Sequence, residues 1–426
     1  YIDPDPIGSL NDDGHNYFLS QNPYTLNSYA GFGEVYYNVL SDLKMIGGLR
    51  WTNDRKHFVN IPSELLVEGF GYPSTGSVDQ QWNEWTGRFA ANWTPKLDFT
   101  DQTLIYGSFA HGYKAGGANP PGAVLLSFQN GDIGRPIHPL TFAPEFINAY
   151  ELGTKNTLLD GALTLNGDVF FYDYKSYQIS EIVDRTSINL NFDATVKGAE
   201  LEMSWEPTPG LKFGFAGGYE ATRLADGSQA VDLIDRADAA HHPDWVVVKP
   251  FITQASNCIV PDYVAAAAIT GGVQNICETL YNLGQSVAGF DPSLPEIHNG
   301  AGFNKDLSGN ELPNAPHFTL SLSGEYTVPV TSNWAATLHS DFYWQAKSYA
   351  RVFNDVPYDQ IHGYTNVNFA VILTSQNGWQ VMGYLKNAFD TTAITGDFLN
   401  SDDTGLTTNI FLTDPRLFGA RITKNL

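Results

Sequence analysis

The stretch PHFTLSLSGEYTVPV, residues 316–330, alternates between apolar and polar side chains. Phe318, Leu320, Leu322 and Tyr326 share one parity, and the threonines, serines and a glutamate share the other. Because successive side chains of a β-strand point to opposite faces, the pattern predicts a strand with one apolar and one polar face. Such a strand fits a soluble sandwich, in which the apolar face meets a second sheet, or a membrane barrel, in which it meets lipid.

The same alternation recurs along the chain, and the connections between alternating segments differ in length. Short links such as LSDL, LLDGA, EPTPG, VPVTSN and TSQNG alternate with long segments rich in Gly, Pro, Asn and Asp. The long segments are residues 61–81, 118–141, 177–193, 225–316, 349–363 and 395–411. Short turns at one rim and long loops at the other are typical of outer-membrane barrels, so we expect the apolar face to meet lipid. Tryptophans near predicted strand ends favour the same interpretation, with ordinary core aromatics as the alternative.

About thirteen strands can be counted, the first near residues 29–40. An odd set of strands cannot close into a barrel with antiparallel pairing throughout, and single-chain bacterial outer-membrane barrels have an even number. We therefore expect the opening part of the barrel to lie outside this chain.

Composition excludes several other classes of protein. The 426 residues carry a formal net charge of −23, and Lys and Arg are few and scattered, so no nucleic-acid partner is expected. Aromatic residues make up 13% of the chain, which is not a disordered composition. The longest small-apolar run, YVAAAAITGG, is shorter than the roughly 18 apolar residues that a transmembrane helix needs.

Two cysteines, Cys258 and Cys277, lie in one of the long segments. An even pair in a chain that looks exported predicts a local disulfide, with two buried free thiols as the alternative. In the chain-entropy model, closing a loop of this size stabilises a fold by about 3 kcal/mol.

Several stretches resemble the TonB-dependent receptors of Gram-negative outer membranes. The most specific is PEFINAYELGTKNTLLDGALTLNGDVFFYDY, which is similar to the family's Pro-Glu…Tyr-Glu-Leu-Gly-x-Lys hairpin. FAHGYKAGGANPPG resembles a strand ending in Gly-Tyr/Phe-Lys-small-Gly-Gly, and VKGAELEMSWEPTPGL resembles a Lys-Gly-x-Glu-Leu-Glu strand. LPNAPHFTLSLSGEY, YLKNAFDTTA and DPRLFGARI are similar to the strand after the large loop and to the closing strands. No motif is decisive alone, but their order along the chain is specific.

The resemblance implies an all-β fold: an antiparallel transmembrane β-barrel of roughly 22 strands with a plugged lumen, of which residues 1–426 supply roughly the last 13. Residues 225–316 would form a large extracellular loop. The plug domain, with the segment that docks the TonB complex of the inner membrane, lies N-terminal in the family and is not recognised in this chain. The chain ends in ARITKNL, which departs from the family's usual terminal aromatic residue, and Lys424 has a lipid-facing parity from which it could snorkel to the interface.

Most motif residues are expected to serve the scaffold. Glu151 and Lys155 share a parity on one strand and could pair toward the lumen. Gly116 and Gly117 would permit a tight bend or a close approach of two backbones. Asn387 suits the end of a strand.

Acidic residues and histidines are concentrated in DLIDRADAAHHPDW, residues 232–245, within the largest loop. Oxygen-rich loops can hold Ca²⁺ and histidine pairs can hold transition metals, but this spacing matches no EF-hand and adjacent histidines point apart in extended chain. We therefore expect a solvated acidic loop and no metal site. Nucleophile–base spacing is not evident, so neither an enzyme nor a cofactor is expected.

Ligand capture in the resembled family uses the extracellular loops and the apices of the plug. The candidate ligand contacts in this chain are Tyr113, Lys114, Asn119, Arg135, Trp245 and Arg351. Aromatic and cationic side chains suit a bulky anionic chelate, although a loop position without a ligand is as good an interpretation for each of them.

The resemblance thus implies an active transporter of the bacterial outer membrane, with membrane lipid and an extracellular small molecule as partners. A ferric siderophore or similar iron chelate fits best. The alternatives are a passive porin, a surface binding or scaffold barrel, and a barrel hydrolase that uses His241 or His242.

Overall fold

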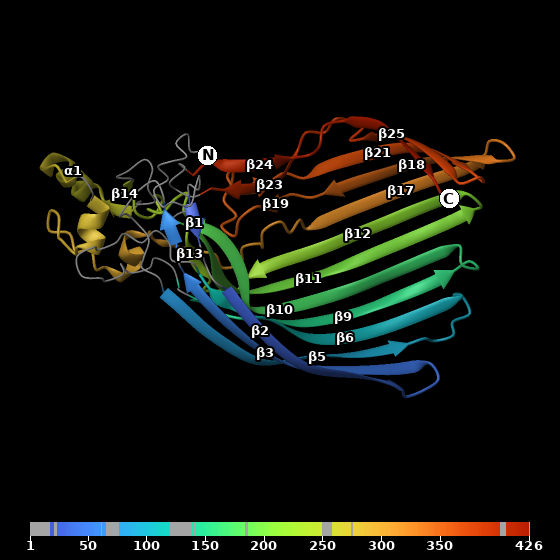
Figure 1. Ribbon diagram of the computed structural model, residues 1–426, viewed down its shortest axis with the longest axis horizontal. Coiled ribbons are helices and arrows are strands. Elements are labelled where there is room, and N and C mark those ends of the chain that lie inside the picture. Colours follow the sequence, from blue (N-terminus) through green and yellow to red (C-terminus); the bar gives the residue numbers. More distant parts are fainter. Residues whose placement is uncertain are drawn as a thin grey trace, which may run out of the picture.

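In a computed structural model of the protein, the structure describes residues 18–20, 24–60, 62–64, 76–119, 139, 141–183, 186–248, 258–273, 276–400 and 406–425. Within them, thirteen strands form one antiparallel sheet in which each strand pairs with the next (Figure 1). The strands are β2 (Tyr24–Asn38), β3 (Leu43–Asn60), β5 (Gly76–Trp93), β6 (Gln102–Lys114), β9 (Glu145–Leu158), β10 (Leu163–Val183), β11 (Thr186–Thr208), β12 (Leu211–Leu224), β17 (Phe318–Pro329), β18 (Trp334–Gln345), β21 (Tyr364–Ser375), β22 (Trp379–Lys386) and β25 (Leu417–Lys424).

The sheet confirms the predicted all-β class and the predicted number of strands. It forms a curved wall (Figure 1). Its edge strands, β2 and β25, do not pair with each other in the described residues, so the wall is open rather than a closed barrel.

The two ends of the wall have different connections. Short links join the strands at one end: residues 39–42, 94–101, 159–162, 209–210, 330–333 and 376–378. Long segments lie at the other end: residues 61–75, 115–144, 225–317, 346–363 and 387–416. The C-terminus reaches the short-turn end (Figure 1). The predicted asymmetry between the two rims is therefore confirmed.

The prediction of a long loop at residues 177–193 is wrong. The strands β10 and β11 continue through this segment and leave only residues 184–185 between them. A register shift between Tyr174 and Tyr177, with φ of 56° at Ser176, marks the start of this extension. Pairing with β9 reaches Lys175 and pairing of β11 with β12 begins at Ala194, so the hairpin stands beyond the main sheet.

The composition of this hairpin explains the error. Its asparagines, serines and aspartate are typical of loops, but they alternate with apolar residues that other loops bury. Ile188 is 1% exposed and Phe192 is 7% exposed. The residues that bury Ile188 and Phe192 come from segments distant along the chain, so the sequence did not indicate that this segment would pack as a hairpin.

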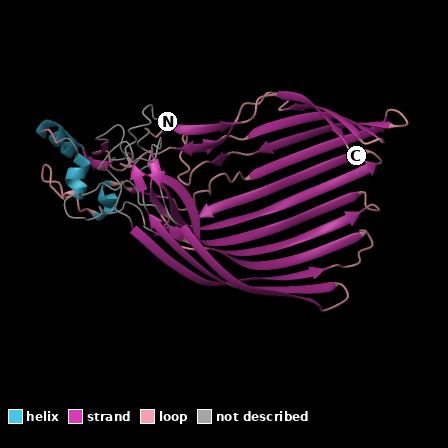
Figure 2. Ribbon diagram, viewed as in Figure 1, coloured by secondary structure: helices cyan, strands magenta, loops and turns pink. Residues whose placement is uncertain are grey.

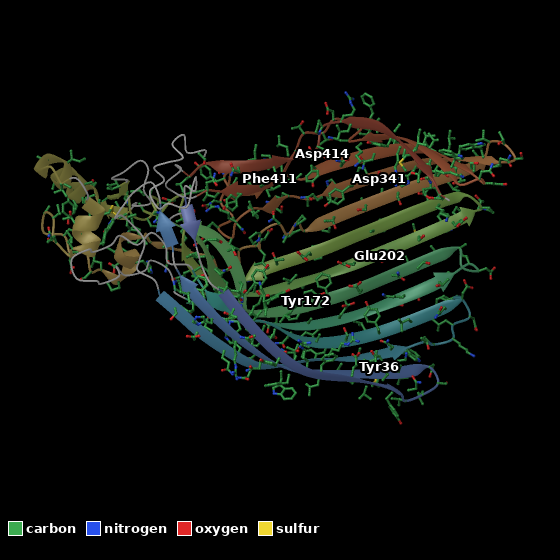
Figure 3. All side chains as sticks on the ribbon, in the orientation of Figure 1. Tyr36, Tyr172, Glu202, Asp341, Phe411 and Asp414 are labelled. Atoms are coloured by element: carbon green, nitrogen blue, oxygen red, sulfur yellow. A yellow bond between two sulfur atoms is a disulfide. The ribbon has the colours of Figure 1, made fainter. Side chains whose placement is uncertain are left out.

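The register separates two faces of the wall. The polar face runs across five neighbouring strands through Asn166, Glu202, Ala216, Ser321 and Tyr343, and the apolar face through Leu165, Met203, Phe215, Leu322 and Phe342. Side chains project from both faces, with Glu202 and Asp341 labelled in Figure 3. Large apolar side chains on the apolar face, such as Val169 (52% exposed) and Leu338 (57%), find no cover within the described chain, as expected for contact with lipid.

Lys424 has the predicted outward parity at the short-turn end. It lies opposite Trp379 in the register. Its Nζ lies 5.5 Å from the centroid of that ring and donates a hydrogen bond to the carbonyl of Asn377. The ammonium therefore sits among aromatic and backbone groups at the rim of the apolar face.

Small elements fill the long-loop end. Short antiparallel pairs are formed by β1 (Phe18–Ser20) with β4 (Pro62–Glu64), β7 (Gly117–Ala118) with β8 (Thr141–Phe142), β13 (Gln229–Val231) with β16 (Asn304–Asp306), β14 (Trp245–Val248) with β15 (Cys258–Pro261), β19 (Ser348–Tyr349) with β20 (Gln360–Ile361), and β23 (Ile394–Leu399) with β24 (Thr408–Leu412). The helical elements are α1 (Asp262–Gly271), the π-helical turn η1 (Glu278–Asn282) and the 3₁₀ turn η2 (Pro295–Gly300).

The helical elements all lie in a lobe that projects beyond the long-loop end (Figure 2). We use the name lobe for residues 225–316. It has its own core, in which Ile259, Val264 and Leu280 have no exposed surface. The predicted disulfide between Cys258 and Cys277 is present and joins β15 to the segment that leads into η1. No helix in the described part of the chain is long and apolar enough to cross a membrane.

The base of the lobe and residues 346–363 pack against the polar face of the wall. Leu312 and Phe353 are buried in a cluster with Phe192 and Val196 of β11, whose parity is that of Glu202. The Leu312 N–H also donates to Thr222 Oγ1 at 2.9 Å. These segments therefore extend over the inner side of the wall at its long-loop end.

Removing the disulfide should destabilise the lobe and leave the wall intact. With Cys258 and Cys277 both changed to serine, we expect the lobe to lose about 3 kcal/mol of stability because its unfolded chain is no longer constrained. Amide hydrogen exchange of residues 258–303 would report this loss. Heat modifiability of the wall on gels is the control, and an unchanged exchange rate in the lobe would contradict the prediction.

The assignment of the two faces predicts unequal effects of a new charge. Leu322→Arg on the apolar face should destabilise the membrane-inserted protein by about 2–4 kcal/mol because the guanidinium enters hydrocarbon. Its neighbour Ser321→Arg, on the polar face, should change stability far less. Denaturant titration of both variants in vesicles measures the difference, and equal losses would contradict the assignment of the faces.

Candidate functional site

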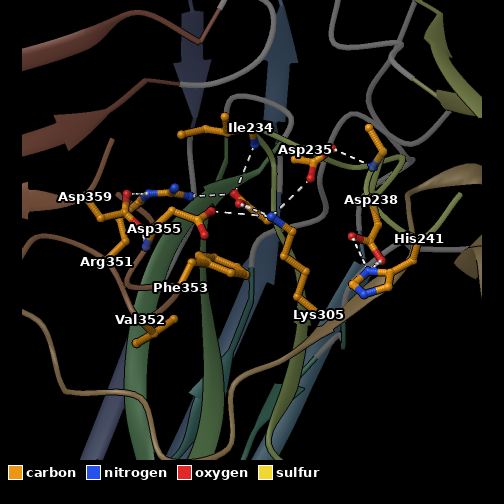
Figure 4. Close-up of polar contacts among 12 residues, drawn as sticks. Ile234, Asp235, Asp238, His241, Lys305, Arg351, Val352, Phe353, Asp355 and Asp359 are labelled. Atoms are coloured by element: carbon orange, nitrogen blue, oxygen red, sulfur yellow. Dashed lines mark hydrogen bonds and ion pairs between the residues drawn. The ribbon is translucent and has the colours of Figure 1, made fainter. Parts of the chain in front are cut away.

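A buried ion cluster joins the lobe to the loop at residues 346–363 (Figure 4). Asp232, which has no exposed surface, is at its centre. Its Oδ1 accepts hydrogen bonds from Arg351 Nη1 at 2.7 Å and from the Ile234 N–H at 3.1 Å. Its Oδ2 accepts a hydrogen bond from Lys305 Nζ at 3.1 Å. One aspartate thus holds two cations that come from different loops.

The two cations also bind other carboxylates. Arg351 Nε donates to Asp359 Oδ1 at 2.6 Å. Lys305 Nζ lies 3.2 Å from an oxygen of Asp235 and 3.4 Å from one of Asp355. The result is a network rather than an isolated pair, and such networks hold their members in place more firmly than single surface ion pairs do.

The cluster favours the charged forms of its central groups. Burial pushes the pKa of Asp232 upward, but the Arg351 guanidinium and the hydrogen bonds to its carboxylate bring that pKa below its usual value. Burial would lower the pKa of Lys305, but Asp232, Asp355 and Asp235 outweigh it and raise that pKa. Asp232 and Lys305 are therefore both ionised at neutral pH, and the lobe is held by fully charged pairs.

The expectation of a solvated acidic loop at residues 232–245 is wrong for Asp232. The sequence shows a run of acids, but the compensating Lys305 and Arg351 lie 73 and 119 residues away along the chain. Nothing local in the sequence reveals them. In the described residues, no group of three or more His, Cys, Asp or Glu side chains is placed to hold a metal ion.

The two adjacent histidines have different partners. The His241 Nδ1 lies 2.9 Å from Asp238 Oδ2, and the His241 side chain is 78% exposed. The His242 ring stacks on Phe303, with 3.7 Å between the ring centroids. The side chains therefore diverge, as the sequence predicted for adjacent residues.

Three of the sequence-predicted ligand contacts are held by contacts within the protein. Trp245 packs edge-on against Phe290 and Phe303 in the core of the lobe. Asn119 is 3% exposed, donates hydrogen bonds from Nδ2 to the carbonyls of Pro139 and Asn189, and accepts one from the Asn189 N–H. Arg351 belongs to the ion cluster. A fourth candidate, Arg135, lies outside the described residues.

At the long-loop end of β6, Lys114 lies in an open position, whereas its neighbour Tyr113 is partly buried and its hydroxyl is buried. Lys114 is 62% exposed, and its Nζ is 3.8 Å from Glu145 Oε2. Tyr113 lines a cavity of about 680 Å³, together with Arg50, Arg88 and Phe32. This volume is in the range of small-molecule sites, about 300–1,000 Å³. Sequence reasoning missed Arg50 and Arg88, which the inward parity of their predicted strands could have indicated.

The close approach expected at Gly116 and Gly117 is present beside this cavity. A Cβ on Gly116 would lie 2.4 Å from the Phe142 carbonyl oxygen, and one on Gly117 would lie 2.6 Å from the Phe142 ring. Only glycine fits there, so the segment that follows Lys114 is fixed against β8.

The expected pairing of Glu151 with Lys155 is replaced by a bridge through Tyr106. The Tyr106 hydroxyl donates to Glu151 Oε1, and Lys155 Nζ lies 5.9 Å from the centroid of the same ring. Tyr106 faces Gly153 in the register, where a Cβ would come within 2.6 Å of the ring. The glycine of the Glu-Leu-Gly-x-Lys motif thus makes room for a tyrosine between the two charges.

Asn387 closes the loop after β22, as its position at a strand end suggested. It is 2% exposed, and its Nδ2 donates to the carbonyls of Thr391 and Asp414. The Thr391 N–H donates back to Asn387 Oδ1. The side chain is therefore part of the scaffold.

Breaking the ion cluster should release the lobe from the wall. Arg351→Met leaves Asp232 and Asp359 buried without the guanidinium, and we expect a loss of about 3–5 kcal/mol in the stability of the loop assembly. Hydrogen exchange of residues 231–248 measures it. The control is Arg223→Met, whose partner Asp226 is 83% exposed, so about 1 kcal/mol or less should be lost. Equal effects of the two variants would contradict the role of the cluster.

Comparisons with known proteins agree with this architecture. The family described as "TonB dependent receptor-like, beta-barrel" matches residues 1–388. Among solved structures, the ferric yersiniabactin uptake receptor FyuA from Yersinia pestis matches 95% of this chain and 46% of its own, with 16% identity and a TM-score of 0.63. The siderophore receptor PiuA from Acinetobacter baumannii matches 94% and 43%, with 14% identity and a TM-score of 0.58. The copper transporter OprC matches 94% and 48%, with 12% identity and a TM-score of 0.56.

The chain spans less than half the length of these solved receptors. At these identities the likeness concerns the fold: an antiparallel wall with an apolar outer face, short turns at one end and long loops at the other. The family match covers most of the chain. The chain therefore belongs to the TonB-dependent receptor family, as part of its β-barrel, and is a protein of the Gram-negative outer membrane.

Proposed function

We propose that the chain is the C-terminal portion of the barrel of a TonB-dependent active transporter that takes up a scarce nutrient. The proposed ligand is a ferric siderophore or a similar iron chelate. In this proposal residues 225–316 are the large extracellular loop, and a plug domain outside residues 1–426 couples the receptor to the TonB complex of the inner membrane. Transport is then powered from the inner membrane, and no catalytic residue or cofactor is required of this chain.

The observation that carries the proposal is the cavity at the long-loop end. Its lining includes the aromatic rings of Tyr113 and Phe32, two arginines and two acids, Glu34 and Asp54, and Lys114 is exposed beside it. A chelate with an aromatic or carboxylate-rich rim needs both kinds of contact: flat apolar surface for its body and cations for its charge. Arg88 is partly neutralised because its Nε donates to Glu34 Oε1, whereas Arg50 Nε donates to the hydroxyl of Thr52.

The family relation supports the class of ligand. FyuA is described as a ferric yersiniabactin uptake receptor and PiuA as a siderophore receptor, and both have a fold similar to that of this chain. OprC, described as a copper transporter, has a similar fold, so the fold alone leaves room for other nutrients. The aromatic rings of the cavity, together with Arg50 and the exposed Lys114, are what support an anionic chelate here.

A passive porin is a weaker alternative. A porin needs an open lumen, whereas here the lobe and residues 346–363 extend over the inner side of the wall. A surface-binding role has one observation in its favour, the disulfide-linked lobe that projects beyond the wall (Figure 1).

Uptake assays test the proposal. Cells that lack the gene should lose growth on specific ferric chelates under iron limitation and should accumulate less radiolabelled iron from them. Reversing the charge with Lys114→Glu should weaken chelate binding by about tenfold, which corresponds to about 1.4 kcal/mol. The control is Lys212→Glu, at the short-turn end, where Lys212 is 57% exposed and binding should be unchanged. If the uptake of no ferric chelate depends on the gene, the proposed ligand class is wrong. If cells that lack the gene instead take up small solutes more slowly by passive diffusion, the result supports the porin alternative.

A further inference from the structure

The register of β6, β9, β10, β11 and β12 locates the boundary of the apolar face at the long-loop end. Three successive rows of outward-facing side chains cross these strands. The first row is Gly107, Leu152, Val169, Ala199 and Tyr219. The second row is Phe109, Tyr150, Phe171, Lys197 and Ala221. The third row, nearest the long loops, is His111, Asn148, Asp173, Thr195 and Arg223. The face therefore changes from apolar through aromatic to polar within three rows.

The aromatic side chains of the second row mark the membrane interface. The Phe109 and Tyr150 rings have centroids 5.1 Å apart, and those of Tyr150 and Phe171 are 6.4 Å apart. All three residues are exposed on the outside of the wall, Tyr150 to 49%. Aromatic girdles of outer-membrane barrels lie at headgroup level, and the long loops are extracellular, so this row lies in the outer leaflet. The outer leaflet of the Gram-negative outer membrane is built from a phosphorylated glycolipid, so phosphate groups lie at this depth.

Lys197 stands in this aromatic row and is exposed. Its neighbours on the adjacent strands are Phe171 and Ala221, which carry no charge. The acids of the polar row and beyond bind other cations: Lys175 Nζ lies 3.3 Å from Asp173 Oδ1 and 3.2 Å from Asp193 Oδ2. Lys197 thus has no ion-pair partner among the described residues. A lysine stem can lie along the apolar surface while its ammonium reaches the headgroups.

Arg223 places a second cation next to Lys197. It lies one row nearer the long loops on β12, in the diagonal position, where side chains of adjacent strands are roughly 7–8 Å apart. Its Nη2 is 2.7 Å from Asp226 Oδ1, but the two side chains are 61% and 83% exposed, so this surface pair is weak. The planar guanidinium has further N–H groups, and its geometry suits the oxygens of a phosphate.

We propose that Lys197 and Arg223 form a binding site for a phosphate group of the outer-leaflet glycolipid. The lipid's acyl chains then lie along the apolar face below, against side chains such as Val169 and Tyr219. Charge complementarity and continuity with the apolar face both favour this occupant, because a lipid that already contacts the face brings its phosphate to the two cations. The site is on the outside of the wall and does not depend on the proposed uptake function.

Native mass spectrometry of the full-length receptor, purified and delipidated in detergent, tests the site by titration with lipid A. The wild-type protein should bind bisphosphorylated lipid A more than about tenfold more tightly than dephosphorylated lipid A. Lys197→Gln and Arg223→Gln should each weaken binding of the phosphorylated lipid about fivefold, as expected for one basic residue at an anionic lipid surface. Neither change should alter binding of the dephosphorylated lipid. The control is Lys212→Gln, on the same strand as Arg223 but on the polar face, which should bind as the wild type does.

Equal binding of the two lipids by the wild-type protein would overturn the proposal, as would unchanged binding of the phosphorylated lipid in both variants. Displacement of the lipid by inorganic phosphate at equal concentration would also overturn it, because the site would then recognise a soluble anion. Heat modifiability on gels checks that each variant has assembled. If one has not, the comparison of the two lipids on the wild-type protein still decides. No chelate enters the experiment, so its failure is distinct from failure of the uptake proposal.

Discussion

Hydrogen bonding between consecutive antiparallel strands is the constraint on which the rest of this structure depends. Hydrocarbon offers no partner for backbone N–H and C=O groups, so each strand of the wall must pair with its neighbours along its length. Thirteen strands do so in chain order. The pairing leaves one face apolar and the other polar, and it sends every long connection to the same end. The position of the lobe and of the candidate site follows from this arrangement.

At the long-loop end the chain is held by different forces. The lobe has a small core of its own and a disulfide, and it is fastened to the wall by apolar contacts with β11 and by the Asp232 cluster. Buried ion pairs of this kind specify an arrangement more than they stabilise it, because desolvation offsets much of their attraction. The same contacts therefore fix the position of the lobe relative to the wall.

Much of the scaffold could be predicted from the sequence. The strand count, the unequal rims, the outward parity of Lys424 and the disulfide partners all depend on short-range patterns that survive in a single chain. The extended β10–β11 hairpin was missed because its asparagines and serines are typical of loops. The structure separates the predicted ligand contacts into two groups. Tyr113 and Lys114 lie at or beside the cavity and stay candidates, whereas the side chains of Asn119, Trp245 and Arg351 contact other residues of the protein.

The sequence by itself determined which segments become strands and which of their faces is apolar, because side chains alternate with a period of two and the pattern is local. Only the tertiary structure decided which charges meet. Asp232 finds Lys305 and Arg351 across 73 and 119 residues because adjacent strands deliver their loops to the same rim. The sequence showed that the loop is acidic. It did not show that Asp232 is buried, because that burial depends on chain segments that are distant along the sequence and adjacent only in the fold.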